Sequence, residues 1–324
     1  MIWVAWRQQR AQVIVLLALL VAGYVTVLLL HGSMRADVAA LGSCATESSV
    51  SGSCGSLGSD FKDSWFDLMK VGEFVVIVLP VLLGMFCAAP LIAREIEHGT
   101  HLLAFTQSVG RTRWMLTKFA VTAVPSLLLV LLLQQAVKSW VDSAGKLSPD
   151  GYSEFQWTTF GTSGVAPLSY LLFCLSFGMT IGILTRRSLV AMATTLATFI
   201  VLRVLLGQSQ GLVGTQRLVS DDPTNSPGQP QGAQYVDSGY LTAQGETLDR
   251  KAAMAQIAPC GSHTNGTVVP GLTDCYRDHG LAKYFVDVLP VSAAPTVHWV
   301  EFAVFTGLAV LSLPVARWAL HRRV

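Results

Sequence analysis

Six apolar segments that contain no charged residue dominate this 324-residue chain. They cover residues 11–30, 74–93, 119–137, 155–185, 188–202 and 302–316. An apolar segment of about 20 residues can cross the hydrocarbon core of a bilayer as a helix. Only 13% of the residues are charged and 52% are hydrophobic, which excludes an ordinary soluble domain. The sequence therefore predicts an all-α polytopic membrane protein with six transmembrane helices.

The fifth and sixth segments are short, so the fifth predicted helix extends past Arg203 and the sixth begins before Glu301. The transmembrane helices are predicted at residues 13–30, 71–93, 119–137, 161–185, 189–207 and 296–317. The connections cover residues 31–70, 94–118, 138–154, 186–188 and 208–295, and a tail covers 318–324. Residues 1–12 combine Trp and Arg, which suits an interfacial helix. An early start of the first transmembrane helix fits these residues equally well.

Basic residues are concentrated in alternate connections, and short cytoplasmic loops retain Lys and Arg. One set comprises Arg7, Arg10, Arg94, Arg111, Arg113, Lys118, Arg186, Arg187, Arg317, Arg322 and Arg323. The same segments hold only two acidic residues, Glu95 and Glu97. Both termini are therefore predicted to be cytoplasmic, and the chain is placed in the plasma membrane with its largest connection, 208–295, outside the cell. The net charge of +2 gives no indication of nucleic acid binding.

Four of the six cysteines fall in connections assigned to the outside of the cell. Their close spacing favours the pairs Cys44 with Cys54 and Cys260 with Cys275, and an oxidising exterior permits both disulfides. Four free thiols are the alternative.

No pattern in the sequence predicts catalysis, nucleotide binding or a metal site. The phosphate-binding pattern G-x-x-x-x-G-K-[ST] is absent, so this chain is not expected to bind ATP. His98 with His101, and His298 with Glu301, have helical spacing but lack the further ligands of a zinc site. The chain is therefore not expected to be an enzyme by itself.

Arg203 is the basic residue that lies deepest in a predicted transmembrane helix. A charge near the centre of a membrane costs about 2.5–3.5 kcal/mol on insertion scales, so Arg203 is expected to face a partner or an aqueous pathway. Reaching the membrane surface with its long side chain is the alternative. Gln134 and Gln135 in the third predicted helix are further pathway candidates with the same ambiguity.

The second connection combines an acidic beginning with a basic end. Glu95 and Glu97 come first, Gly99 and Thr100 offer a break and a cap, and basic residues follow at 111–118. This order predicts two short helices that form a rigid lever at the inner membrane face. A basic connector held by lipid explains the Arg residues but leaves the acidic beginning unexplained.

Three stretches resemble the permease subunits of the ABC-2 exporter family, in particular the permeases common in actinobacteria. They are W-R-Q-Q-R at residues 6–10, A-R-E-I-E-H-G-T-H at 93–101 with T-Q-S at 106–108 and R-W at 113–114, and W-V-E at 299–301. The middle stretch is the most specific of the three. G-type ABC exporters are similar, and they place a large, often disulfide-bonded outer loop before the last helix, which Cys260 and Cys275 suit.

The resemblance implies an exporter subunit that works with a second permease, either a copy or a paralogue, and with two separate ATPase subunits that hold ATP and Mg. It places the pathway between the second and fifth helices, and it implies that the lever contacts the ATPase through Arg94, Glu95, Glu97, His98, Gly99 and Thr100. Few intramembrane charges indicate an apolar or amphipathic cargo such as a drug, peptide or lipid. The alternative is a non-transporting membrane sensor or scaffold that binds an extracellular ligand or partner.

Overall fold

The computed structural model describes residues 2–42, 54–99, 110–148, 154–230, 232–260 and 271–323. The chain divides into two units. The helical unit comprises Met1–Tyr152, Gln156–Gln208 and Pro295–Val324, and the strand unit comprises Ser153–Phe155 and Ser209–Ala294.

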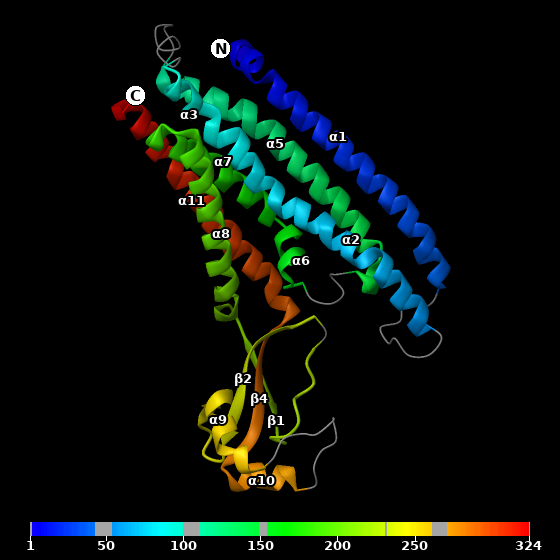
Figure 1. The fold of residues 1–324 in the computed structure, drawn as a ribbon. Coiled ribbons are helices and arrows are strands. Elements are labelled where there is room, and N and C mark those ends of the chain that lie inside the picture. Colours follow the sequence, from blue (N-terminus) through cyan, green and yellow to red (C-terminus); the bar gives the residue numbers. More distant parts are fainter. Residues whose placement is uncertain are drawn as a thin grey trace. The chain divides into compact units, whose positions relative to one another are not determined.

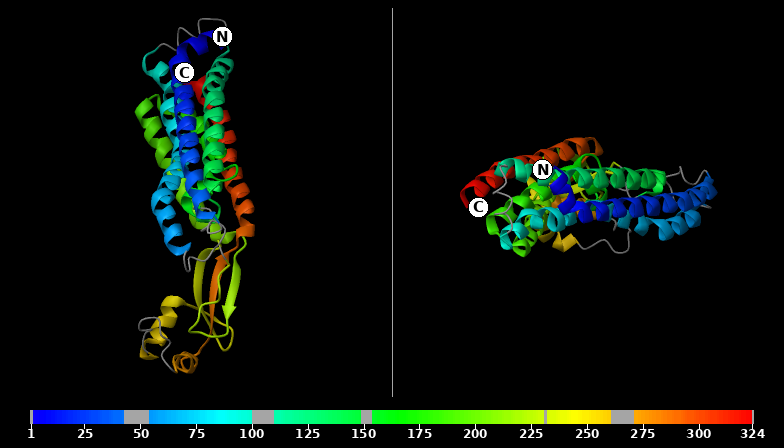
Figure 2. Two further views of the ribbon diagram at one scale, coloured as in Figure 1. Left: turned by 90° about the vertical axis from the view of Figure 1, so that its right-hand side faces the viewer. Right: turned by 90° about the horizontal axis from the view of Figure 1, so that it is seen from above.

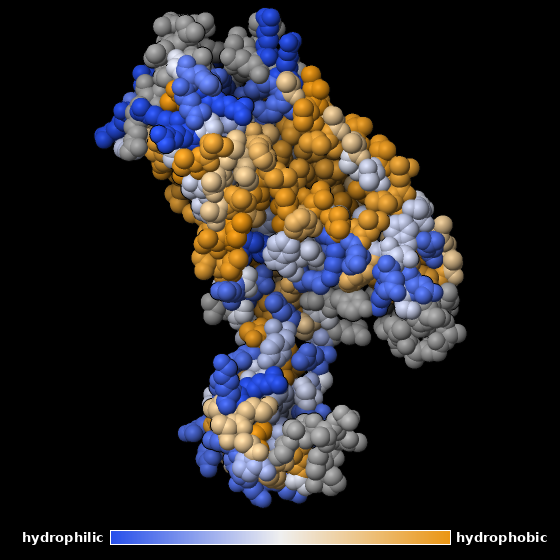
Figure 3. All heavy atoms as spheres, viewed as in Figure 1, coloured by the Kyte–Doolittle hydropathy of each residue, from blue (hydrophilic) through white to orange (hydrophobic). Residues whose placement is uncertain are grey.

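Six helices in the described part of the chain are long and apolar enough to cross a membrane, which confirms the predicted six-helix architecture (Figure 1). They are α1 (Ile2–Leu41), α2 (Cys54–Leu83) with its continuation, α5 (Arg111–Asp142), α7 (Ala166–Thr185), α8 (Ser188–Ser209) and α11 (Ala294–Arg323). Apolar side chains cover much of their outer surface in Figure 3, and Leu29, Leu189 and Leu311 are at least 66% exposed. Such a surface is suited to contact with lipid.

The helices extend beyond the predicted transmembrane segments. α1 runs without interruption through residue 12, where a separate interfacial helix was predicted to end, and continues to Leu41. α2 begins at Cys54, within the predicted connection 31–70, and α5 begins at Arg111. Hydropathy marks only the part of a helix that contacts lipid, whereas polar residues continue the same helix into water.

The second transmembrane segment changes its helical geometry near its end. After Pro80, the residues Gly84–Ala88 form a π-helix (η2), and α3 (Ala89–Glu97) follows with Pro90 in its first turn. Pro90 has no N–H, and its ring crowds the carbonyl of the preceding turn, so the regular α-helical pattern cannot continue there.

α7 packs at the centre of the helical unit. Its side chains belong to three apolar clusters. The first also contains residues of α1, α2 and α5. The second contains residues of α2, α8 and α11, and the third contains residues of α3, α5 and α11. Glycines allow η2 and α3 to approach α7 closely. A Cβ at Gly84 of η2 would lie 2.5 Å from Cβ of Cys174, and one at Gly182 of α7 would lie 2.4 Å from the carbonyl oxygen of Ala89. No side chain fits at these distances.

Two short helices, η3 (Gly145–Leu147) and α6 (Trp157–Thr162), lie between α5 and α7. The predicted fourth transmembrane helix began at residue 161, but the long helix starts only at Ala166. Gly164 has a φ of +59° and interrupts the chain after α6, and Pro167 then occupies the first turn of α7.

The strand unit is a small folded domain, whereas the sequence predicted a long loop at 208–295. Its four antiparallel strands have the order β1-β4-β2-β3. They are β1 (Gln216–Ser220), β2 (Gln234–Thr242), β3 (Thr247–Asp249) and β4 (Leu281–Leu289), accompanied by η4 (Gln210–Leu212), α9 (Arg250–Gln256), η5 (Ala258–Cys260), α10 (Leu272–Asp278) and η6 (Val291–Ala293). Strand β1 exposes most of its residues, so it gives no clear apolar alternation in the sequence.

The glycine contacts of α7 give the first prediction. Gly182→Ala forces its Cβ against the backbone of Ala89, and we expect the free energy of unfolding to fall by about 1–3 kcal/mol. Thermal unfolding of the detergent-purified protein measures the change. Gly307→Ala in α11 is the control, because a Cβ there meets nothing within 4 Å. Equal unfolding temperatures for the two variants would contradict the close-packing assignment.

Candidate functional site

One end of the helical unit brings together several helix ends. The Arg111 Nη1 atom at the start of α5 donates to the carbonyl oxygens of Leu320 (3.5 Å) and His321 (3.4 Å) near the end of α11. Thr122 Oγ1 in α5 donates to Gln9 Oε1 in α1 at 3.3 Å. The first turns of α1 and the last turns of α11 lie at this same end in Figures 1 and 2. This is the end at which the basic connections of the sequence converge.

Glu97, the last residue of α3, holds the first residue of α8. Its Oε1 accepts a hydrogen bond from the backbone N–H of Ser188, and its Oε2 accepts one from Ser188 Oγ, each at 2.8 Å. The first N–H groups of a helix have no acceptor within the helix, and a carboxylate beside them is favoured electrostatically. Glu97 therefore acts as the N-terminal cap of a helix 91 residues further along the chain.

Glu95 makes a second connection, from α3 to α5. Its carboxylate forms an ion pair with Lys118, whose side chain is 5% exposed. The Lys118 Nζ atom also lies 4.7 Å from the centroid of the Trp114 ring. Apolar residues of α3, α5, α7 and α11, among them Ile92 and Met179, pack beside these contacts. The two carboxylates thus fix the orientation of α3 against two different transmembrane helices.

We call α3 and the two residues after it, residues 89–99, the elbow. The sequence assigned six elbow or adjacent residues to one contact surface, but the structure divides them. Arg94, Glu97 and His98 are exposed, Glu95 is half-buried, and Gly99 ends the elbow with a φ of +70°. Glu95 and Glu97 bind neighbouring helices of the same chain. Thr100 lies outside the described residues.

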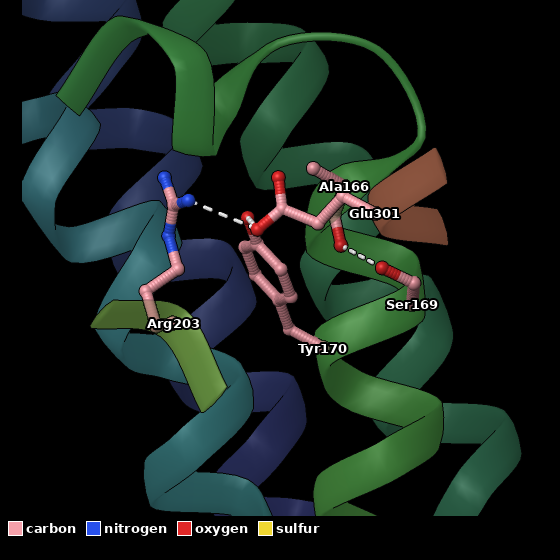
Figure 4. A network of polar contacts seen from close by, with 5 residues as sticks. All are labelled: Ala166, Ser169, Tyr170, Arg203 and Glu301. Carbon is pink, nitrogen blue, oxygen red and sulfur yellow. Dashed lines mark hydrogen bonds and ion pairs between the residues drawn. The ribbon is translucent and has the colours of Figure 1, made fainter. Parts of the chain in front are cut away.

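A buried ion pair lies at the other end of α8. Arg203 Nη1 donates to Glu301 Oε1 of α11 at 2.9 Å, and the Tyr170 hydroxyl of α7 donates to the same oxygen at 2.9 Å (Figure 4). Arg203 is 5% exposed and Glu301 is 3% exposed. The Arg203 side chain is therefore enclosed within the helical unit, and it joins three helices through one carboxylate.

Further buried polar contacts surround this ion pair. Gln134 Nε2 of α5 donates to the carbonyl oxygens of Thr162 (3.0 Å) and Gly164 (2.8 Å), which fixes the connection between α6 and α7. The Thr159 hydroxyl donates to the buried carboxylate of Glu73 in α2 at 3.2 Å. We call these residues the polar layer: Glu73, Gln134, Thr159, Tyr170, Arg203 and Glu301.

The three pathway candidates from the sequence have different positions. Arg203 and Gln134 belong to the polar layer, while Gln135 is exposed on the outer surface of α5. Glu73 and Tyr170 were not among the site residues predicted from the sequence. Glu73 lies at the edge of an apolar segment, a position that signals an intramembrane charge needing a partner, whereas a tyrosine in an apolar run gives no comparable signal.

Cys260 and Cys275 form a disulfide in the strand unit, as their spacing favoured. His279 Nδ1 lies 2.8 Å from the Cys275 carbonyl oxygen, and the three residues are close enough to resemble a metal site. Because both sulfur atoms are joined to each other, they are not available as thiolate ligands. Cys44 and the side chain of Cys54 lie outside the described part of the chain.

Six helices long and apolar enough to cross a membrane, a charged elbow at one end and a buried polar layer describe a multi-pass membrane protein. The family model described as ABC-2 membrane transporter related matches residues 17–209, from α1 to the end of α8. The chain belongs to this family and is a permease-type protein of the cell membrane. No curated protein and no solved structure matches the chain.

The connection between the elbow and α8 can be tested by hydrogen exchange. Glu97→Gln removes the charged acceptor of the Ser188 N–H, so we expect faster amide exchange in the first turn of α8. Mass spectrometry of peptides that cover residues 186–195 measures this rate. Glu95→Gln is the matched control, because Glu95 binds Lys118 and not α8. The same acceleration in both variants would show that Glu97 has no specific capping role.

The buried ion pair gives a third prediction. Arg203→Met or Glu301→Met leaves one buried charge without its partner, and we expect each to lower the free energy of unfolding by about 3–5 kcal/mol. The double variant should be more stable than either single variant, since no charge is then left alone. Chemical unfolding followed by tryptophan fluorescence tests this order. The exposed pair Arg217 and Asp287 is the control, with an expected effect of about 1 kcal/mol or less.

Proposed function

We propose that this chain is the permease subunit of an ATP-driven exporter that moves an apolar or amphipathic substrate out across the cytoplasmic membrane. Membrane components of this family usually work with separate ABC ATPase subunits. In the proposed complex, two ATPase subunits bind ATP and Mg, and this chain pairs with a second copy or a paralogue. This chain itself carries out no hydrolysis.

The observation that carries the proposal is the attachment of one short helix to two transmembrane helices. Glu95 attaches α3 to α5, and Glu97 attaches it to α8. A displacement of α3 by a partner protein therefore has to move α5 and α8 or break these contacts. A connector held only by lipid would not need the two internal carboxylate contacts.

α8 provides a route from the elbow to the opposite side of the membrane. Its buried side chains lie along one stripe, formed by Ser188, Ala191, Thr195, Phe199 and Arg203. The stripe begins at the contact with Glu97 and ends at the ion pair with Glu301. Fifteen residues of helix separate these two contacts, which is about 22 Å at 1.5 Å per residue. A push on the elbow is thereby passed to the polar layer and to α11.

The charges inside the helical unit support an apolar or amphipathic substrate. Arg203 and Glu301 neutralise each other, and Glu73 is buried against Thr159. A substrate with an uncompensated charge would need a charged partner in the membrane. Arg203 and Glu301 do not provide this partner, because each is already paired with the other. We place the pathway beside α2 and α8, the second and fifth membrane-crossing helices.

Residues of the elbow that bind neighbouring helices and residues without such contacts have different proposed roles. Arg94 and His98 are exposed at the charged end and can contact the ATPase. Glu95 and Glu97 transmit the resulting movement within the permease. The concentration of basic residues at this end supports its location in the cytoplasm.

Co-expression with a candidate ABC ATPase subunit tests the proposal. Glu97→Arg places a cation at the start of α8, where positive charge is unfavourable, so we expect the ATPase to remain bound while permease-stimulated ATP hydrolysis falls at least severalfold. Arg94→Glu should instead reduce the amount of ATPase that co-purifies. Both quantities are measured on the complex reconstituted in lipid.

Asp63→Arg is the matched control. It makes the same charge reversal at an exposed residue of α2, far from the elbow in the sequence, and it should leave both quantities unchanged. Full stimulation of hydrolysis by Glu97→Arg would refute transmission through this residue. If no ATP-hydrolysing protein binds the wild-type permease, the sensor or scaffold alternative replaces the exporter.

A further inference from the structure

The strand unit contains a cavity of about 200 Å³ that is lined by three tyrosines and one arginine. Tyr240 of β2 and Tyr284 of β4 are direct partners in the sheet, and their ring centroids lie 5.0 Å apart. Tyr276 of α10 lies 6.2 Å from Tyr240 by the same measure. Arg250, the first residue of α9, completes this group. We call this space the tyrosine cavity.

The walls of the tyrosine cavity are fixed by contacts within the strand unit. The disulfide between Cys260 and Cys275 ties down the residue next to Tyr276. Residues 223–226 form another wall, and Asp222 holds this segment in place. Its Oδ1 accepts hydrogen bonds from Thr224 N (2.9 Å) and Thr224 Oγ1 (2.7 Å), and from Thr273 Oγ1 of α10 (3.3 Å). A cavity with such walls is formed before any ligand arrives.

The groups that line the cavity have unused hydrogen-bonding capacity. Within the described residues, the hydroxyls of Tyr240, Tyr276 and Tyr284 make no hydrogen bond, and the Arg250 guanidinium forms no ion pair. Burial raises the pKa of Tyr240 to about 12, so this hydroxyl stays protonated at neutral pH and can donate. Arg250 is the single charged side chain among the lining residues of this described cavity.

These properties select a ligand class. A guanidinium binds a carboxylate through two parallel hydrogen bonds, and it would repel a cation. Tyrosine rings pack against flat apolar groups, and their hydroxyls add polar contacts at the edge. The volume is smaller than that of sites for drug-sized molecules, which begin at about 300 Å³. A single ring that carries one carboxylate matches the charge, the shape and the size.

We propose that the tyrosine cavity is a binding site for a small monocyclic carboxylate, with the carboxylate on Arg250 and the ring among the three tyrosines. The site would operate in addition to the elbow and the polar layer. It would give the transporter a ligand contact in the strand unit, independent of ATP-dependent transport.

Fluorine NMR on the full-length protein in lipid nanodiscs tests the proposal with 4-fluorobenzoate as the probe. We expect saturable line broadening with a dissociation constant in the millimolar range or tighter. 4-Fluorobenzamide has the same shape without the charge, and it should bind at least about tenfold more weakly. Arg250→Gln should weaken the binding of 4-fluorobenzoate by a similar factor.

Lys251→Gln is the matched control, because it removes the same charge from the neighbouring residue, which does not line the cavity. It should leave the binding of 4-fluorobenzoate unchanged. Tyr276→Phe retains the ring and should have a smaller effect than Arg250→Gln. Correct folding of each variant is checked by the absence of reactive thiols at Cys260 and Cys275. No saturable binding to the wild type, equal binding of the two probes, or equal effects of the Arg250 and Lys251 variants would each overturn the proposal.

Discussion

The structure of the helical unit depends on supplying internal partners to polar groups where water is scarce. In a hydrocarbon environment an unpaired polar group costs several kcal/mol, so buried polar side chains have to meet each other or the backbone. Glu301 Oε1 accepts hydrogen bonds from both Arg203 Nη1 and the Tyr170 hydroxyl. Within the described residues, Arg203 Nε and Glu301 Oε2 stay buried without a hydrogen-bond partner, so the requirement is met only in part. Gln134 Nε2 donates hydrogen bonds to the carbonyl oxygens of Thr162 and Gly164, which lie at the end of α6 and in the turn after it and have no partner within a helix. These contacts determine which faces of α5, α7, α8 and α11 point toward one another.

α8 shows how few contacts can determine the position of a membrane helix. Apolar side chains gain little by leaving lipid for a protein interior, so the apolar surface of α8 does not by itself select a neighbour. Glu97 at one end and Glu301 at the other supply directional contacts. Both are carboxylates from other helices, and each binds a group at a different end of the buried stripe. Such an arrangement allows the helix to move as a rod while its two ends remain assigned to their partners.

The number of transmembrane helices could be predicted because each apolar segment can be recognised from its own length and composition. The partners of polar residues could not be predicted in the same way. Glu73 and Glu301 both lie at the edges of apolar segments, and only the packing of α8 against α11 selects Glu301 as the partner of Arg203. Likewise, nothing near Glu97 in the sequence indicates Ser188 as its partner.

The elbow was partly predictable for a related reason. The order of acidic and basic residues predicted two short helices beside the membrane, and α3, the first of them, ends close to the predicted break at Gly99. The segment predicted for the second helix falls at residues 100–109, outside the described part of the chain. Whether a particular glutamate faces outward or inward depends on the rotation of α3, which Pro90 and the preceding π-helix set. The strand unit was not predicted, since its small core rests on residues dispersed over strands and helices rather than on a regular apolar period.

The first and last strands of the strand unit are neighbours: Gln216 of β1 pairs with Val288 of β4. The chain thus enters and leaves this domain at adjacent points, and the family match ends at residue 209, just before the entry. Joining two nearby points with a longer or shorter insert changes loop-closure entropy only slowly. A segment of different length between α8 and α11 would therefore cost the membrane helices little in conformational entropy.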